Sequence, residues 1–324
     1  MKIGITPLGN HALRRIIPQI KGSGFELSAV YSRDEDKAGE IAKQHNALAC
    51  SSLDELCNSG IDAVYISSPN SLHYSQAKKF LEKNIHVLLE KQMTLSKQEA
   101  DDLIDMARRK GVILGVGFHL RFHPALSRIL ELMRREEIGD LLRISGMWCG
   151  AGSSSNTDEK RAWWNKPEMA GGGSVMGTGV HVLDTIIKIS GGKPERVYGW
   201  RHPKESTIEN TFLIDLLYSR HTASMLSSRE VEIPDNSLSI IGTEGIILSR
   251  NHFSTDTDSS LYLNGNKIGD FKGINMYHKE LEAFRNEIDG KETLLAKGED
   301  GAIVVNVVNS AVDSVLSGKS IALK

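Results

Sequence analysis

Glu90 and Lys91 are the residues whose position points most clearly to chemistry. They follow residues 85–89, a short apolar run with the length and flanks of a buried parallel strand. In open α/β sheets, ligands bind beyond the carboxyl ends of the strands. A lysine at that edge can take part in chemistry on a ligand. The alternative interpretation is that Glu90 and Lys91 are only a solvated pair after a core strand. The patterns before and after the pair decide between these two interpretations.

The turn after the first predicted strand, 2–6, is a candidate dinucleotide site. Gly9 and Ala12 hold the second and third positions of a G-x-G-x-x-G/A fingerprint, and a proline holds the first. Gly9 would let the backbone approach a pyrophosphate, and the following helix would offer its N-terminal amides. A plain strand-turn-helix connection carries the same incomplete pattern. The cofactor-binding candidates of this turn are Pro7, Leu8, Gly9, Asn10 and His11.

The end of the second predicted strand, 26–31, indicates which cofactor is used. An NAD site places an acidic residue there to bind the ribose 2′-hydroxyl. Ser32 and Arg33 stand there instead, and the fork of an arginine suits a 2′-phosphate. NADP is therefore the predicted cofactor. NAD is the alternative, in which Arg33 is solvated and Asp34 binds the ribose.

These candidates are placed by an alternation of apolar strands and amphipathic helices. The strands are predicted near 2–6, 26–31, 62–66, 85–89 and 112–116, and the helices near 10–21, 35–45, 70–82 and 96–110. The alternation is typical of a parallel sheet with helical crossovers. Ser96 and Glu99 form a capping box at the last of these helices. Pro69 and Asn70 form a turn after strand 62–66, where Asn70 could also serve only as a helix cap.

Length and composition exclude several classes of protein. The 324 residues suggest about two domains. A net charge of −2 with scattered Lys and Arg argues against nucleic acid or a membrane as partner. Three cysteines without a CxxC argue against a disulfide framework or a cysteine zinc site. No apolar run approaches the ~20 residues that span a bilayer. With a strand-like start and no leader, a cytoplasmic protein is expected.

A series of short motifs runs along the whole chain. Ser-Pro-Asn-x-x-His stands at 68–73 and His-Val-x-x-Glu-Lys at 86–91. Further on stand Gly-Phe-His-Leu-Arg-Phe-His-Pro at 117–124, Glu-Ile-Gly-Asp at 137–140, Ala-Gly-Gly-Gly at 170–173, Gly-Val-His-Val-Leu-Asp at 179–184, Gly-Thr-Glu-Gly at 242–245 and Ser-Gly-Lys-Ser at 317–320. In this order the set resembles the Gfo/Idh/MocA oxidoreductases, named for glucose–fructose oxidoreductase, inositol dehydrogenase and a rhizopine-catabolism protein. Each motif is modest alone, and the ordered set is specific.

The resemblance implies an α/β fold of two domains. Residues 1–119 would form an N-terminal Rossmann dinucleotide-binding domain. Residues 120–324 would form a C-terminal α+β domain with a large, mostly antiparallel open sheet that binds substrate and joins subunits. Helix 299–316 would pack back on the first domain.

The resemblance also implies hydride transfer between NADP or NAD and a carbon of a sugar, a sugar derivative or a polyol. Such a reaction needs a base for the hydroxyl proton. His181 is the expected acid/base, and Lys91 is expected to bind the same oxygen. Asp184 lies three residues from His181 on one helix face, and with Arg121 and Trp163 it is expected on the substrate side. Further cofactor-binding candidates follow the strands, namely Ser68, Pro69, Asn70, His73, Glu90 and Lys91.

Ordinary structural roles compete with some of these assignments. A helical histidine such as His181 is usually a core or capping residue. Of the adjacent Trp163 and Trp164, one could pack in the core and the other over a seam.

Residues 171–190 are expected to form a helix whose glycine-rich start approaches the cofactor closely.

Three residues depart from the family pattern. Pro7 replaces the first glycine of the fingerprint, and Gln92 replaces a proline that often follows the lysine at a cis peptide bond. Gly177 stands where many members carry an aspartate, four residues before the histidine. These departures keep one rival function open, a non-catalytic cofactor-binding regulator. The other rival is an NAD-dependent glycosidase, as in family members that oxidise a sugar transiently and regenerate the cofactor. The retention of Lys91 and His181 argues for the enzyme.

The C-terminal strands predict a homo-oligomer. Residues 211–218 are apolar on both faces, because Leu213 and Leu217 stand opposite the residues that would face the core. Helices can cover one face of the sheet, and an apolar second face needs a partner subunit. A homodimer or homotetramer through this sheet is therefore expected. His119 and His123 lack the helical context of a metal site, so no metal is expected.

Overall fold

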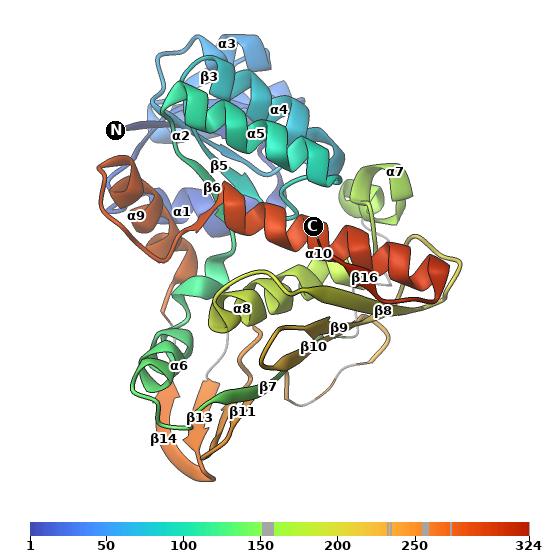
Figure 1. The fold of residues 1–324 in the computed structure, drawn as a ribbon. Helices are drawn as coiled ribbons and strands as arrows, with labels where there is room; N and C mark the ends of the chain where they lie inside the picture. Colours follow the sequence, from blue (N-terminus) through green and yellow to red (C-terminus); the bar gives the residue numbers. More distant parts are fainter. Residues whose placement is uncertain (151–158, 232, 234, 255–258, 273, 324) are drawn as a thin grey trace. The chain divides into compact units, whose positions relative to one another are not determined.

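The computed structural model describes residues 1–150, 159–231, 233, 235–254, 259–272 and 274–323. The chain divides into two compact units (Figure 1). One contains Met1–His119 and Asn275–Ala302, and the other contains Leu120–Ile274 and Ile303–Lys324. The segment Asn275–Ala302 thus belongs to the first unit, whereas a single boundary after residue 119 placed it in the second.

The first unit is built on a seven-stranded sheet with the order β15-β6-β5-β4-β1-β2-β3. Its strands are β1 (Lys2–Thr6), β2 (Glu26–Tyr31), β3 (Leu48–Cys50), β4 (Ala63–Ile66), β5 (His86–Glu90), β6 (Leu114–Gly117) and β15 (Ala296–Lys297). The pairs among β1 to β6 are parallel, and β15 adds an antiparallel edge strand beside β6. The pairing of β15 is one reason why the chain returns to this unit. The short β3 is missing from the sequence prediction, since three residues are too few for a periodic pattern.

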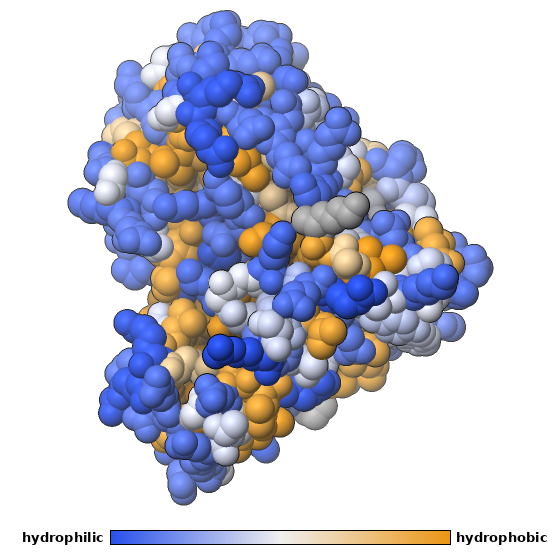
Figure 2. Space-filling view, in the orientation of Figure 1, coloured by the Kyte–Doolittle hydropathy of each residue, from blue (hydrophilic) through white to orange (hydrophobic). Residues whose placement is uncertain are grey.

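Helices cover the sheet of the first unit. They are the π-helix η1 (Ala12–Ile16), α1 (Ile17–Ile20), α2 (Glu35–His45), α3 (Leu53–Cys57), α4 (Asn70–Glu82), α5 (Lys97–Lys110) and α9 (Met276–Ile288). The capping box of Ser96 and Glu99 is present at the start of α5, and Gly111 ends that helix in a left-handed conformation. The outer surface over α3, α4 and α5 is largely hydrophilic (Figure 2). The buried strands β4, β5 and β6 form the core beneath these helices.

The second unit is built on a nine-stranded sheet with the order β14-β13-β12-β11-β7-β10-β9-β8-β16. Its strands are β7 (Leu141–Cys149), β8 (Arg196–His202), β9 (Thr211–Leu217), β10 (Thr222–Ser228), β11 (Leu238–Gly242), β12 (Ile246–Arg250), β13 (Ser259–Leu263), β14 (Asn266–Phe271) and β16 (Ile321–Ala322). Only the central pair of β7 and β10 is parallel in the described part of this sheet. The prediction of a mostly antiparallel sheet is confirmed.

Helices lie on one face of this second sheet. The helical elements are η2 (His119–Phe122), α6 (Pro124–Arg134), η3 (Glu159–Asn165), α7 (Pro167–Ala170), η4 (Val175–Gly179), α8 (Val180–Ser190) and α10 (Gly298–Ser317). α8 packs on β7 and β10. α10 approaches β8 closely, because a Cβ at Gly199 would lie 2.3 Å from the carbonyl oxygen of Ala311. No helix in the described ranges is long and apolar enough to cross a membrane.

Candidate active site

The carboxyl edge of the first sheet brings most of the predicted cofactor residues together. β5, β4, β1 and β2 are neighbours and run in parallel. Their carboxyl ends carry Glu90, Ser68, Pro7 and Ser32 in that order across the sheet. The structure therefore places these four connections at one edge, where parallel sheets bind ligands.

The turn after β1 combines a buried anchor with an open backbone. Leu8 is buried, while a Cβ built on Gly9 meets no atom of the described chain within 4 Å. The Thr6–Pro7 peptide bond is cis, and the carbonyl of Gly9 accepts a hydrogen bond from the amide of Leu13 at 3.0 Å. Asn10 is exposed and His11 is half-buried. An exposed glycine before a helix is the arrangement that lets a pyrophosphate approach the main chain.

The turn after β2 leaves Arg33 available and occupies Asp34. The carboxylate of Asp34 caps α2 by accepting from the amide of Lys37 at 3.1 Å, and it also pairs with the ammonium of Lys37 at 3.3 Å. The hydroxyl of Ser32 accepts from the amide of Asp34 at 3.2 Å. Arg33 is exposed. The carboxylate of Asp34 is therefore engaged at the start of α2, whereas the side chain of Arg33 is exposed.

His73 joins the turn after β4 to the segment after β5. Its Nε2 lies 2.8 Å from the carbonyl oxygen of Ser68, and its Nδ1 lies 2.7 Å from that of Gln92. The ring is fully buried, and burial lowers its pKa. His73 thus holds two site segments together from within the core. Asn70 is buried as the first residue of α4, and the N-cap position belongs to Pro69.

Glu90 is the most heavily engaged side chain of this edge. Its Oε1 accepts a hydrogen bond of 2.5 Å from the hydroxyl of Tyr65 and lies 3.1 Å from Nε2 of His11. Its Oε2 accepts from the backbone amide of Lys91 at 3.2 Å. Burial alone would raise the pKa of Glu90, but His11, Lys91 and Tyr65 together lower it from its ordinary value of 4.5 to about 2. The carboxylate is therefore ionised at neutral pH.

Tyr65 was not among the residues that the sequence indicated. It is a fully buried residue of β4, and burial followed by the charge of Glu90 raises the pKa of its hydroxyl well above the ordinary value. The only sequence signal was a hydroxyl inside an otherwise apolar strand, which is also common for ordinary core tyrosines.

Lys91 stands half-buried just beyond β5. Burial lowers the pKa of its amine, and the charge of Glu90 opposes that effect. The Lys91–Gln92 peptide bond is cis although Gln92 has replaced the proline. A lysine with a lowered pKa at the ligand-binding edge is suited to exchange a proton or to bind a developing oxyanion.

Besides Nε2 of His11, which lies at ion-pair distance from Glu90, three buried polar groups near this edge lack a hydrogen-bond partner within the described chain. They are the hydroxyls of Thr6 and Ser68 and the side-chain amide of Gln92. They stand at or just after the carboxyl ends of β1, β4 and β5. Buried polar groups are nearly always paired in native proteins. Together with the open backbone at Gly9, these groups fit a dinucleotide with its hydroxyl and amide substituents.

In the second unit, His181 lies in the first turn of α8 and is buried. Its ring centroid is 5.6 Å from that of Trp148 on β7. Its backbone carbonyl accepts a hydrogen bond of 3.0 Å from the hydroxyl of Thr185. The histidine is thus held by its own helix and by an aromatic neighbour.

The glycine-rich stretch before α8 differs from the prediction of a helix from residue 171. Gly171 ends α7 in a left-handed conformation, and the helical turns begin only at Ser174. The carboxylate of Glu209 accepts from the amides of Gly173 at 2.7 Å and Val175 at 2.8 Å. A Cβ at Gly173 would lie 1.8 Å from the carbonyl oxygen of Glu209. Gly173 is therefore required by the close backbone of Glu209.

Arg121 and Asp184 form a buried ion pair. Nε of Arg121 donates to both carboxylate oxygens of Asp184 at 3.1 and 2.9 Å, and Nη2 donates to Oδ1 at 2.6 Å. Both side chains are at most 2% exposed. The pair ties η2 to the helix that carries His181. Both residues were expected on the substrate side, and the structure shows them engaged with each other.

Trp163 lies in η3, where its ring stacks on that of Trp164 at 4.3 Å between centroids. Both rings are half-buried. A Cβ built on Gly177 meets no described atom within 4 Å, so this position has room for the aspartate of other family members. No cluster of three metal-binding side chains occurs among the residues that the structure describes.

Comparison with known proteins defines the class of protein. Residues 1–118 match the oxidoreductase family with an NAD-binding Rossmann fold, GFO_IDH_MocA, and residues 126–248 match the GFO/IDH/MocA C-terminal domain. The chain belongs to the Gfo/Idh/MocA family and is an NAD(P)-dependent oxidoreductase. The family resemblance and the fold class predicted from the sequence are confirmed.

Individual relatives extend this finding over the full length. D-xylose 1-dehydrogenase (NADP(+)) 2 of Haloferax volcanii is 26% identical over 331 residues and covers 100% of each chain. Scyllo-inositol 2-dehydrogenase (NADP(+)) of Bacillus subtilis is 32% identical over 209 residues, which are 63% of this chain and 62% of its own. The solved aldose-aldose oxidoreductase of Caulobacter crescentus has the same fold, with a TM-score of 0.88 at 21% identity over 100% of this chain and 99% of that one.

Proposed function

We propose that this chain transfers a hydride between NADP and a hydroxyl-bearing carbon of a sugar, a sugar derivative or a polyol. The observation that carries the proposal is Lys91, a half-buried lysine with a lowered pKa beside an ionised Glu90 at the ligand edge of a dinucleotide fold. Relatives named as xylose and inositol dehydrogenases support the substrate class.

Each catalytic residue has a distinct proposed role. NADP, when bound, supplies the hydride acceptor for oxidation or the donor for reduction. In oxidation, Lys91 binds the substrate oxygen and favours its alkoxide, while His181 accepts the hydroxyl proton as the C–H bond loses its hydride. In reduction, His181 returns the proton to the oxygen. A positioned acid/base of this kind typically contributes 10²–10⁴-fold to the rate.

The proposed cofactor contacts follow the edge of the first sheet. The turn at Gly9 holds the pyrophosphate, Ser32 and Arg33 bind the 2′-phosphate, and Ser68 and Asn70 line the path from the pyrophosphate toward Lys91. The exposed guanidinium of Arg33 and the capping role of Asp34 support NADP over NAD.

Of the residues expected on the substrate side, we assign Trp163 to contact with the substrate and Arg121 and Asp184 to support of the site. The flat ring of Trp163 supports a sugar-binding role, because aromatic faces combine a large apolar area with a defined geometry. Arg121 and Asp184 are already paired at 2.6 Å, so we assign them to fixing the helix of His181.

We further propose that the open face of the second sheet binds a second copy of the chain, and that the protein works in the cytoplasm. Trp200, Leu213, Leu226 and Met147 lie opposite one another across β8, β9, β10 and β7. Trp200 is 51% exposed and Leu217 is 44% exposed. Large apolar side chains on an exposed sheet face favour burial against a partner. This supports a homodimer or a homotetramer.

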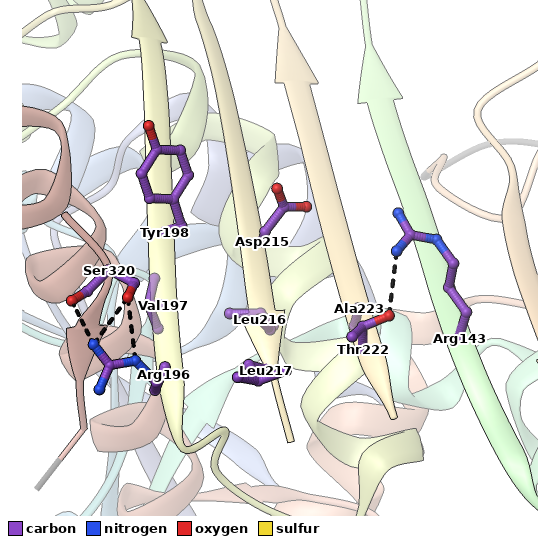
Figure 3. A pocket seen from close by; sticks show the side chains of 10 residues that line it. All are labelled: Arg143, Arg196, Val197, Tyr198, Asp215, Leu216, Leu217, Thr222, Ala223 and Ser320. Carbon is purple, nitrogen blue, oxygen red and sulfur yellow. Dashed lines mark hydrogen bonds between the residues drawn. The ribbon is translucent and has the colours of Figure 1, made fainter. Parts of the chain in front are cut away.

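A shallow pocket of about 360 Å³ lies in the same face (Figure 3). Arg196 donates to Ser320, and Arg143 donates to Thr222 at 3.2 Å, so these two cations border the pocket in fixed positions. Tyr198, on the same strand as Arg196, lies opposite Asp215 on β9. A second copy of the chain could therefore place a side chain in this recess and form polar contacts with the residues around it.

The proposed reaction is tested with a panel of sugars, ketoses and polyols, offered with NADPH, NADP⁺, NADH and NAD⁺. The expected result is a net change of nicotinamide absorbance with at least one compound. Release of a sugar from a glycoside without such a change would establish a glycosidase instead. Tight cofactor binding with no turnover of any compound would support a regulator.

A further inference from the structure

The carboxylate of Glu90 is contacted from two parts of the first unit, by the ring of His11 and by the backbone amide of Lys91. Lys91 follows it directly, just beyond β5, and His11 comes from the turn after β1, with Nε2 at 3.1 Å from Oε1. The hydroxyl of Tyr65 fixes the same oxygen at 2.5 Å. The charge of Glu90 is therefore shared between the cofactor turn and the lysine.

The ring of His11 is held by packing on two sides. It stacks on Tyr65 with 6.5 Å between centroids and meets the ring of Tyr277 edge-on at 5.4 Å. Tyr277 belongs to α9 and stacks on His119 at 4.3 Å. These contacts keep His11 directed at Glu90 although its side chain is 37% exposed.

The neighbours of Glu90 differ in whether they carry charge. Burial lowers the pKa of His119 to about 3 and also lowers that of His73, while burial raises that of Tyr65. His119 and Tyr65 are therefore neutral at neutral pH, and the charge of Glu280, a buried carboxylate of α9, also acts on Tyr65. Lys91 and His11 are the basic side chains that act directly on the carboxylate of Glu90, while Arg15 lies over the ring of Tyr277.

We propose that His11 is a positioning residue that sets the proton affinity of the Lys91 amine by sharing the carboxylate of Glu90. A negative charge beside an amine strengthens its hold on a proton, and a polar or cationic group that neutralises the carboxylate weakens that effect. His11 thereby links the cofactor turn to the lysine of the site. This inference rests on the proposed function of Lys91.

The test measures the Lys91 amine directly, without turnover. Lysines of the full chain are ¹³C-methylated, the Lys91 signal is assigned with Lys91→Met, and its titration is followed by NMR. His11→Leu should raise the pKa of Lys91 by about half a pH unit or more, because Glu90 then faces Lys91 without its competitor. Glu90→Gln should lower it. His45→Leu removes an exposed histidine of α2 and should change nothing.

The double variant separates direct from indirect action. In the Glu90→Gln background, His11→Leu should have no further effect on Lys91, because its route through the carboxylate is gone. If His11→Leu does not fold, His11→Gln keeps a polar side chain of similar size and is measured instead. An unchanged Lys91 titration in the His11 variant would overturn the proposal, as would an equal effect with and without Glu90.

Turnover and cofactor binding provide the second readout. The limb of the pH–rate profile that reports Lys91 should move upward with the NMR titration in His11→Leu, while NADPH affinity, from nucleotide fluorescence, is measured separately. Weaker NADPH binding with an unchanged profile would make His11 a cofactor contact only and contradict the proposal. A fully active Lys91→Met would refute the proposed function of Lys91 but leave the NMR result for His11 standing.

Discussion

Replacement of Arg121 by methionine tests whether the buried ion pair positions α8. The substitution keeps an unbranched chain and removes the three hydrogen bonds that Arg121 donates to Asp184. Asp184 is 2% exposed, so its carboxylate stays out of water after the change. Removing one partner of a buried pair typically destabilises a protein by about 3–5 kcal/mol. We expect that loss in the free energy of unfolding, measured by urea titration with circular dichroism.

Two variants control for the other consequences of this change. Arg128→Met breaks the ion pair of Arg128 with Glu131 on α6, whose side chains are 37% and 44% exposed; a surface pair contributes only about 0–1 kcal/mol. Arg121→Met combined with Asp184→Leu removes both charges and should recover most of the loss. If Arg121→Met unfolds within about 1 kcal/mol of Arg128→Met, the pair does not support the helix of His181.

Three further predictions concern the cofactor, the carboxylate and the sheet. Arg33→Asp should weaken NADPH binding and spare NADH; equal losses for both cofactors, measured by nucleotide fluorescence, would show that Arg33 does not read the 2′-phosphate. Glu90 has a folded pKa of about 2 against an ordinary 4.5, so its stabilisation is complete above about pH 4.5 and is lost as the pH falls toward 2. The loss amounts to about 3 kcal/mol, and unfolding of Glu90→Gln should lack this dependence. Trp200→Glu should convert a dimer or tetramer into a chain of 35.7 kDa in light scattering, whereas a monomeric wild type would refute the proposed interface.

The regular elements followed from the sequence because their patterns are local. The capping box at Ser96 and the alternation of strands in the first domain depend on residues only a few positions apart. The same is true of β2 and α2, whose bounds match the predicted ranges. Periodicity and capping act within one element, so they can be read without knowing its neighbours.

Features that depend on contacts between distant residues could not be predicted from local patterns. Gly173 is a glycine because the backbone of Glu209 lies against it, and no pattern within residues 170–180 contains that neighbour. The return of Asn275–Ala302 to the first unit depends on the pairing of β15 with β6. A two-residue strand has no periodicity of its own. Such contacts between distant residues exist only in the folded chain.

The site was predicted in its residue types but not in its connections. Strand position and motif both marked Lys91, Glu90 and the strand-end turns as candidates, and their roles stay predictions. Tyr65 and the pairing of Arg121 with Asp184 were not found, because a hydrogen-bond partner cannot be assigned from residue type alone. The engaged state of Asp184 changes its proposed role from substrate contact to support of α8.

The central claim, that Lys91 and His181 act in one chemical step, is tested most directly by a double-variant cycle. Lys91→Met deletes the charge, and His181→Gln keeps a planar polar group without useful basicity. Each should lower kcat by 10²–10⁴-fold, about 3–5 kcal/mol, while NADPH affinity stays within a few-fold. Residues that act as a unit do not add, so the double variant should be far less impaired than the product of the two single losses. Strict multiplication of the two losses, or an active Lys91→Met enzyme, would contradict the account.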